Sequence, residues 1–267
     1  MIEKLQKLHE ILMSMENVVI AYSGGLDSSF LLRVASDVLG SKVVAVTANS
    51  LIHPRKEIQE SKILAMRLGV RHKIIETREL SNPKFLSNSK DRCYWCKREM
   101  YGELVNSAGK DNALIDGTNY DDLNDFRPGL RAASELGVRS PLIEAMLTKE
   151  DIRNLSKDMG LETWNKPSLS CLATRFPYGM KITKDNIARV DKAEEFLRAR
   201  GIIQVRVRHH DAIARIEVMD MDIRKLTGKD FREKIVRYFK ELGYLYITID
   251  FEGYRTGSMN KIIKEYQ

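Results

Sequence analysis

The chain has 267 residues, of which 43% are apolar and 30% are charged, and its formal net charge is +7. It is longer than one small domain and can bury a substantial core, which excludes a disordered chain, a collagen-like repeat and a disulfide-dense miniprotein. The longest apolar runs are far shorter than a membrane span, and no secretory signal is visible. Together with a count of only three cysteines, this predicts a reduced, cytoplasmic setting without a membrane partner.

The first half of the chain alternates between two kinds of apolar pattern. Buried-strand runs at 18–22, 42–48, 73–76 and 113–116 alternate with helical spacing at 2–15, 30–38, 55–68 and 92–107. Strands that alternate with helices predict a parallel sheet covered on both faces, the doubly wound α/β class. In that class, ligands bind at the carboxyl ends of the strands.

The pattern changes in the second half. Residues 117–129 hold too many turn formers for regular structure, and a capping box at 148–151 opens a helix to about residue 159. Residues 166–178 are interpreted as a long functional loop or linker. Beyond it we expect helices at 183–200 and 229–242 and strands near 203–208, 212–219 and 244–251, the first two forming an antiparallel pair. The domains predicted are therefore residues 1–175, an α/β domain, and residues 176–267, a smaller α+β domain.

The strongest motif follows the first predicted strand directly. It reads Ser23-Gly24-Gly25-Leu26-Asp27-Ser28-Ser29 and precedes a predicted helix. Glycines allow the backbone to approach a phosphate closely, and the helix start offers unpaired amides and the positive end of its dipole. Asp27 could organise Mg²⁺ at the same phosphates. A plain glycine turn with a helix cap is the alternative, but the whole arrangement favours phosphate binding, although the lysine of a Walker A loop is absent.

The cysteines form the second motif. Cys93-Tyr94-Trp95-Cys96 has the spacing of metal ligands, and Cys171 lies in the predicted functional loop. A structural zinc site usually has four protein ligands, so a fourth is missing unless a histidine supplies it. Three thiolates instead suit a [4Fe–4S] cluster with one open iron. Three buried, inert cysteines are the alternative.

Two arginines alternate along one predicted strand. Arg206 and Arg208 share a face and can grip a phosphate, while a solvated edge strand is the other interpretation. Residues 176–267 hold 19 basic and 14 acidic side chains, a net of +5, which is thin support for a nucleic-acid surface.

Residues 23–29 resemble the pyrophosphate loop of the PP-loop ATPases. Further motifs resemble the LarE-type sulfur transferases within that superfamily, over nearly the whole chain: Gly117-Thr118-Asn119 with Asp122 and Asp125, Arg127-Pro128-Gly129, the run from Pro167 to Arg175, and Val205-Arg206-Val207-Arg208-His209. The resemblance implies ATP, Mg²⁺ and adenylation of a carboxylate of a pyridinium mononucleotide. That carboxylate becomes a thiocarboxylate on the route to the nickel-pincer cofactor.

The resemblance also implies roles for particular residues. Nucleotide contacts are expected from Ser23, Gly24, Gly25, Asp27, Ser28, Ser29, Thr47, Gly117, Thr118, Asp122 and Arg127. Arg206 and Arg208 are expected at the substrate phosphate, and Glu194 or Glu195 at a metal ion. Cys171 alone serves as sulfur donor in some members, whereas three cysteines, here Cys93, Cys96 and Cys171, hold a [4Fe–4S] cluster in others. Trp95 is a candidate for stacking on the pyridinium ring. A homo-oligomer and a sulfide donor are the expected partners, and RNA is not.

Two other functions remain open from the sequence. A tRNA-thiolating PP-loop enzyme also uses ATP and is often built on three cysteines, but it would want a larger basic surface. A regulatory nucleotide-binding protein with structural zinc would need neither the intact loop nor an open ligand position.

Overall fold

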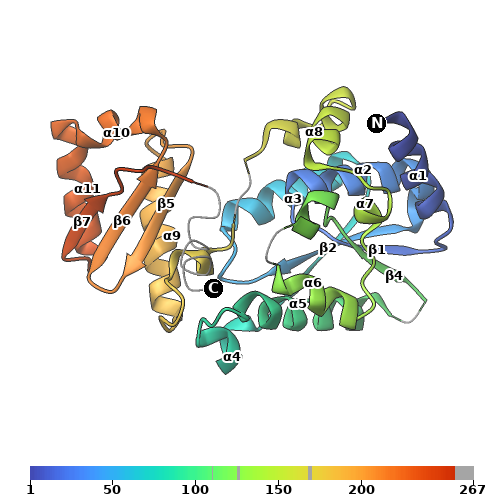
Figure 1. The fold of residues 1–267 in the computed structure, drawn as a ribbon, viewed down its shortest axis with the longest axis horizontal. Helices are drawn as coiled ribbons and strands as arrows, with labels where there is room; N and C mark the ends of the chain where they lie inside the picture. Colours follow the sequence, from blue (N-terminus) through green and yellow to red (C-terminus); the bar gives the residue numbers. More distant parts are fainter. Residues whose placement is uncertain (110, 125–126, 168–169, 256–267) are drawn as a thin grey trace. The chain divides into compact units, whose positions relative to one another are not determined.

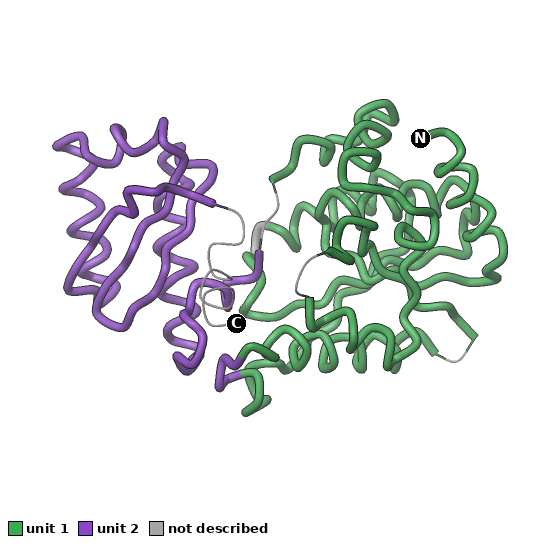
Figure 2. Tube along the Cα trace, in the orientation of Figure 1, with its two compact units in different colours: residues 1–85, 90–169 green, residues 86–89, 170–267 purple. Residues whose placement is uncertain are grey.

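The computed structural model describes residues 1–109, 111–124, 127–167 and 170–255. Its contacts divide the chain into two compact units, one of Met1–Phe85 and Lys90–Leu169 and the other of Leu86–Ser89 and Ser170–Gln267 (Figure 2). Residues 170–175 belong to the second unit, where the Arg175 side chain pairs with Glu194. Among the described residues, no helix combines the length and apolar character needed to cross a membrane.

The first unit contains a sheet and its covering helices (Figure 1). Its strands are β1 (Val18–Ala21), β2 (Val43–Asn49), β3 (Arg71–Glu76) and β4 (Ala113–Asp116). Its α-helices are α1 (Ile2–Met13), α2 (Leu26–Leu39), α3 (Arg55–Arg67), α4 (Pro83–Leu86), α5 (Arg92–Ala108), α6 (Pro128–Glu135), α7 (Pro141–Glu144) and α8 (Lys149–Asp158). Short 3-10 helices are η1 (Gly40–Lys42), η2 (Glu79–Ser81), η3 (Tyr120–Asn124) and η4 (Glu162–Asn165).

The sheet of the first unit has the order β3-β2-β1-β4, and every pair in it is parallel. The chain runs outward from β1 through β2 to β3 and then crosses back to place β4 on the other side of β1. The order therefore reverses between β1 and β4, where a doubly wound sheet opens its ligand crevice. The predicted α/β class is confirmed.

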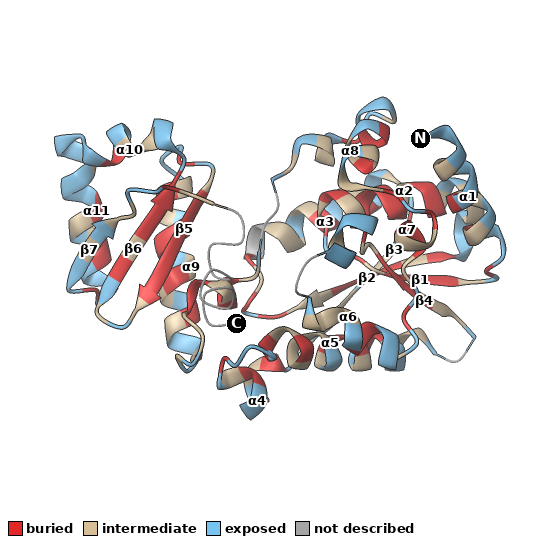
Figure 3. Cartoon of the chain, in the orientation of Figure 1, coloured by how far each residue is buried: buried red, intermediate tan, exposed pale blue. Residues whose placement is uncertain are grey.

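Alternate residues of each strand pack against different helices. Val18 and Ile20 of β1 belong to the core formed with α1, α2 and α8, whereas Val19 packs with α5 and α6 on the opposite face. Strands β1, β2 and β4 are accordingly largely buried, as Figure 3 shows by colour, whereas the edge strand β3 alternates between exposed and half-buried residues. This explains why the strands appear in the sequence as continuous apolar runs.

The second unit is a small α+β structure. It contains η5 (Leu172–Arg175), α9 (Lys184–Arg198), β5 (Val205–His210), β6 (Ile213–Val218), α10 (Asp220–Thr227), α11 (Lys229–Glu241) and β7 (Tyr246–Ile249). The predicted antiparallel pairing of β5 with β6 is confirmed, and β7 pairs parallel to β6. Valines of β5 and β6 pack with α9 and α11 to form this unit's own core.

Some elements differ from the prediction. The polar stretch 117–129 was expected to lack regular structure, but it contains η3 and the first residues of α6, whose Pro128 suits a helix start. The loop 166–178 contains η5, and α10 fills residues 220–227, which the apolar pattern left unassigned. These elements are short, so their periodicity is too brief to detect.

Candidate active site

The glycine loop lies at the reversal of strand order. β1 ends at Ala21, and α2 begins at Leu26 with Gly25 as its N-cap residue and no side-chain cap. The first amides of α2 therefore remain available to a ligand, and the helix dipole adds partial positive charge there. Gly24 has a φ of +72°, a conformation in which a side chain would be strained. The local sequence thus builds an anion cradle.

Serine side chains support this loop from within. The Ser23 and Ser28 hydroxyls lie 3.0 Å apart, and Ser28 Oγ donates to the Gly25 carbonyl at 3.3 Å. Ser29 is fully buried. Burial raises the pKa of the adjacent Tyr22 to about 12, although the Ser29 hydroxyl opposes the shift. Ser23 and Ser28 thus line the glycine loop, whereas Ser29 is buried beneath it.

The two carboxylate oxygens of Asp27 have different environments. Its Oδ2 pairs with Lys149 Nζ, while the buried Oδ1 has no hydrogen-bond partner among the described residues. A buried carboxylate oxygen without a partner is costly unless a cation or donor joins it. Oxygen ligands of this kind are what Mg²⁺ prefers, so the site fits that ion. The unpartnered Oδ1 of Asp27 is the atom at which such an ion would fit.

Lys149 was not foreseen in the sequence. It is the first residue of α8, where the predicted capping box between Thr148 and Asp151 is confirmed, and its backbone amide donates to Asp121 at 2.7 Å. The capping box fixes the start of α8 and so places the Lys149 ammonium beside the glycine loop. That loop has no lysine of its own at the Walker A position. Because Lys149 is 122 residues from Asp27, local patterns hold no signal for the pair.

The segment after β4 contacts the loop closely. A Cβ on Gly117 would lie 2.8 Å from the Ser28 backbone nitrogen, so only glycine fits. Thr118 is held by Asp116, which accepts from its amide at 3.1 Å and from its hydroxyl at 2.8 Å. Gly117 is therefore brought beside the loop, and Thr118 is fixed immediately after it.

Two other predicted nucleotide residues form an ion pair near this segment. Asp122 Oδ1 lies 2.9 Å from Arg127 Nη2. Burial raises the pKa of Asp122, although Arg127 opposes the shift. The charges of Asp27 and Lys149 also act on Asp122, so the structure brings the predicted residues Asp27, Asp122 and Arg127 together. Asp125 lies outside the described residues.

Thr47 has a different environment from the other predicted nucleotide residues. Its hydroxyl donates to the Tyr22 carbonyl at 2.7 Å and lies 2.7 Å from Nε2 of His72. Thr47 is buried and ties β2 to the residue that precedes the loop. It supports the loop through Tyr22.

The cysteines belong to both units. Cys93 and Cys96 lie one turn apart on α5, which places them on the same helix face, and both are half-buried. Cys171 caps η5 in the second unit. Within the described residues there is no group of three His, Cys, Asp or Glu side chains that could hold a metal ion. A cluster shared by all three cysteines therefore stays a prediction.

Trp95, which lies between the two cysteines of α5, contacts two neighbours. Its ring meets Tyr94 edge-to-face with centroids 4.9 Å apart, and Lys84 Nζ lies 3.9 Å from the ring centroid. A cation thus already covers part of the ring that was the candidate for stacking on a pyridinium.

Glu194 is the centre of a buried charge cluster in the second unit. Its Oε1 accepts from Arg175 Nε at 2.6 Å and from the Val207 amide at 2.9 Å. Its Oε2 accepts from Arg175 Nη2 at 3.0 Å and from Arg198. Burial alone would raise the pKa of Glu194, but the arginines lower it to about 2. Both oxygens are fully engaged, so a metal ion would have to replace one of these donors. The alternative residue, Glu195, is exposed.

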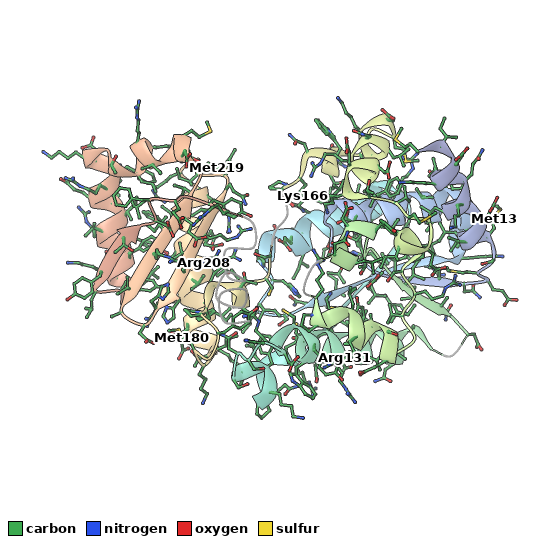
Figure 4. The ribbon with its side chains drawn as sticks, in the orientation of Figure 1. Met13, Arg131, Lys166, Met180, Arg208 and Met219 are labelled. Atoms are coloured by element: carbon green, nitrogen blue, oxygen red, sulfur yellow. The ribbon has the colours of Figure 1, made fainter. Side chains whose placement is uncertain are left out.

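Arg206 and Arg208 lie on β5 as expected, and both are buried, so the alternative of a solvated edge face is wrong. Figure 4 labels Arg208 on this strand. Arg208 binds Glu217 through two nitrogens, at 2.9 and 2.7 Å, and its charge is neutralised. Burial and the nearby charge of Arg175 lower the pKa of Arg206 to about 10. Glu194 opposes this shift, and Arg206 Nη1 donates to the Val205 carbonyl at 2.9 Å.

Comparisons with known proteins agree with this geometry. A family model described as the arginosuccinate synthase N-terminal HUP domain matches residues 17–92, which include the loop and α2. A Lactiplantibacillus plantarum protein named pyridinium-3,5-bisthiocarboxylic acid mononucleotide synthase is 39% identical, covering 96% of this chain and 93% of its own. An uncharacterised protein of Synechocystis is 40% identical over 97% of this chain and 98% of its own. The glutamine-hydrolysing GMP synthase of Aeropyrum pernix is 25% identical over 56% of this chain and 33% of its own.

Proposed function

Since the chain belongs to the LarE-type family of ATP-dependent sulfur transferases in the PP-loop superfamily, we propose that it converts a pyridinium mononucleotide carboxylate into a thiocarboxylate. The observation that carries the proposal is the uncapped start of α2 behind Gly24 and Gly25, which suits the pyrophosphate of ATP. The relative from Lactiplantibacillus plantarum, similar over nearly its whole length, is named for synthesis of such a thiocarboxylate.

The first stage is adenylation. A carboxylate oxygen of the substrate attacks the α-phosphorus of ATP, the bond to the bridging oxygen breaks, and pyrophosphate leaves with that electron pair. The amides at the start of α2 stabilise the charge on the departing phosphates, and Lys149 is within reach of the same cradle once it leaves Asp27. Asp27 would hold Mg²⁺ through its unpartnered Oδ1.

The second stage replaces oxygen by sulfur. A sulfur nucleophile attacks the acyl carbon, the bond to the AMP oxygen breaks, and the product is a thiocarboxylate. Adenylation is needed because a free carboxylate repels an anion, whereas AMP is a competent leaving group. If Cys171 provides the sulfur, its thiolate first forms an acyl-cysteine thioester; loss of the Cα proton and cleavage of the Cβ–Sγ bond then release the thiocarboxylate and leave dehydroalanine. Alternatively, the three cysteines act together to deliver a sulfide.

The three thiols are a soft donor set that fits a [4Fe–4S] cluster. Cys93 and Cys96 would provide two ligands from one face of α5, and Cys171 would provide the third. When bound, such a cluster would offer an iron without a protein ligand, which can hold an external sulfide.

The substrate phosphate is assigned to the buried arginines of the second unit. Arg206 is a buried guanidinium close to the charges of Arg175 and Arg198, and Arg208 is held rigidly by Glu217 and by the Thr174 carbonyl at 2.7 Å. A preorganised guanidinium loses little entropy on binding an anion. Arg206 is the primary contact in this proposal.

The proposal is tested by pyrophosphate release from Mg²⁺·ATP with two candidate substrates, a pyridinium carboxylate mononucleotide and bulk tRNA. We expect release with the mononucleotide alone. Release only with tRNA, weakened steeply by salt, would instead identify a tRNA-thiolating enzyme.

A further inference from the structure

Lys166 connects the glycine loop to two other parts of the first unit. It follows η4 directly, and its Nζ donates to the Gly24 carbonyl at 2.9 Å and to Glu60 Oε2 at 2.8 Å (Figure 4). Only 16% of its side chain is exposed, against 40% for Glu60. A largely buried lysine on a backbone carbonyl is a specific arrangement, because its charge must be balanced there.

The lysine determines which way one peptide of the loop faces. In a trans peptide, the carbonyl and the following N–H point in opposite directions, and no cis bond occurs in the described chain. With the Gly24 carbonyl directed to Lys166, the Gly25 N–H is directed to the other side, where it donates to Ser23 Oγ at 3.3 Å. That bond is long, so a phosphate oxygen can readily replace the hydroxyl.

The packing of α3 limits the loop further. A Cβ on Gly24 would lie 3.0 Å from Ser61 Cβ and 3.5 Å from the Glu57 carbonyl oxygen. Glu60, which holds Lys166, is the neighbour of Ser61 on the same helix. Gly24 is therefore in contact with α3 on one side and with the lysine at its carbonyl.

We propose that Lys166 is a positioning residue of the ATP site, which orients the Gly24–Gly25 peptide so that the Gly25 N–H faces the pyrophosphate of ATP. The cation also polarises the peptide and strengthens its N–H as a donor. Lys166 acts through the backbone and does not itself bind phosphate. The inference rests on the proposed function, since it takes the pyrophosphate of ATP as the occupant of the loop.

The test is calorimetric titration of the full chain with Mg²⁺·pyrophosphate, Mg²⁺·ATP and adenosine, without any carboxylate substrate. We expect Lys166→Met to weaken pyrophosphate and ATP about tenfold, which corresponds to about 1.4 kcal/mol, while adenosine affinity is unchanged. Lys166→Arg should restore most of the affinity. Lys157→Met, which changes another lysine in contact with the same segment through Trp164, is the control and should bind as the wild type does.

Glu60→Gln separates positioning from direct contact with phosphate. If Lys166 acts through the carbonyl, loss of Glu60 loosens the lysine and weakens pyrophosphate binding. If Lys166 binds phosphate itself, loss of the competing carboxylate strengthens binding, and the proposal is overturned. Unchanged pyrophosphate affinity in Lys166→Met, or an equal loss for adenosine, would also overturn it. Because these titrations need no adenylation, their outcome is independent of whether the proposed reaction occurs.

Discussion

At Gly25 the site depends on a missing side chain. Its φ of −79° is open to any residue, and a Cβ there would meet only Ser23 Oγ, at 3.3 Å. Gly25→Val should therefore fold normally, yet its branched side chain would fill the space that a phosphate needs. We expect pyrophosphate release to fall by ~10²-fold or more, as when a preorganised donor site is lost.

The control for this variant is Gly102→Val on α5, where an added Cβ has no atom within 4 Å. Circular dichroism melting checks the fold of both variants. A folded Gly25→Val enzyme that releases pyrophosphate at the wild-type rate would remove the loop from the mechanism.

Lys149 is a residue whose importance is visible only in the folded chain. Its pair with Asp27 places a cation beside the cradle, so Lys149→Met should lower the rate of pyrophosphate release by about tenfold or more. Lys4→Met is a matched control, because Lys4 of α1 pairs with Asp151 on α8, the helix that carries Lys149. The exposed fractions of the two lysine side chains are similar, 33% for Lys4 and 34% for Lys149. Equal rates in the two variants would show that Lys149 has no part in the reaction.

At the scale of elements, the contact between α9 and β5 depends on one carboxylate. The pKa of Glu194 is about 2 in the folded protein, below its ordinary value of 4.5. A lowered carboxyl pKa gives stability that is complete above the ordinary value and is lost as the pH falls from about 4.5 towards 2. Acid should therefore unfold the second unit within this window.

Glu194→Gln tests this directly. It leaves Arg175 buried without its counter-charge, and removing one partner of a buried pair costs ~3–5 kcal/mol. Denaturant unfolding should show that loss at neutral pH and a flatter pH dependence between 4.5 and 2. Glu195→Gln, on the exposed side of α9, should behave as the wild type; if both variants match it, the pair does not stabilise the unit.

Elements were predictable where their signal is local. The loop between β1 and α2 follows from an apolar run, two glycines and a helical period, and the capping box at Thr148 needs only four residues. The charge pairs were not predictable in this way. Lys149 and Asp27 are 122 residues apart, and Arg175 and Glu194 are 19 apart, so tertiary packing alone brings them together.

At the scale of the whole molecule, the cysteines come from both units. If Cys93, Cys96 and Cys171 share one cluster, replacing any one by Ala should remove the iron–sulfur absorbance and sulfur transfer. Pyrophosphate release should survive, since the glycine loop needs no thiolate. Anaerobic purification, absorbance spectra and assays of both stages provide the measurement.

A sacrificial Cys171 gives a different result. Only Cys171→Ala would then be inactive, turnover would stop at one, and the spent protein would be lighter by the mass of H₂S in intact-protein mass spectrometry. A fully active Cys93→Ala enzyme that carries dehydroalanine at position 171 would exclude the shared cluster and leave the sulfur-transferase assignment intact.

The central claim is that the substrate carboxylate is activated as an adenylate before sulfur replaces its oxygen. The most direct measurement uses a pyridinium mononucleotide whose carboxylate carries heavy oxygen, incubated with the enzyme, Mg²⁺·ATP and sulfide, followed by mass spectrometry of the nucleotide product. We predict one heavy oxygen atom in AMP, because the oxygen that attacks the α-phosphorus leaves with it when sulfur enters. Thiocarboxylate formed together with unlabelled AMP, or with ADP, would contradict the account.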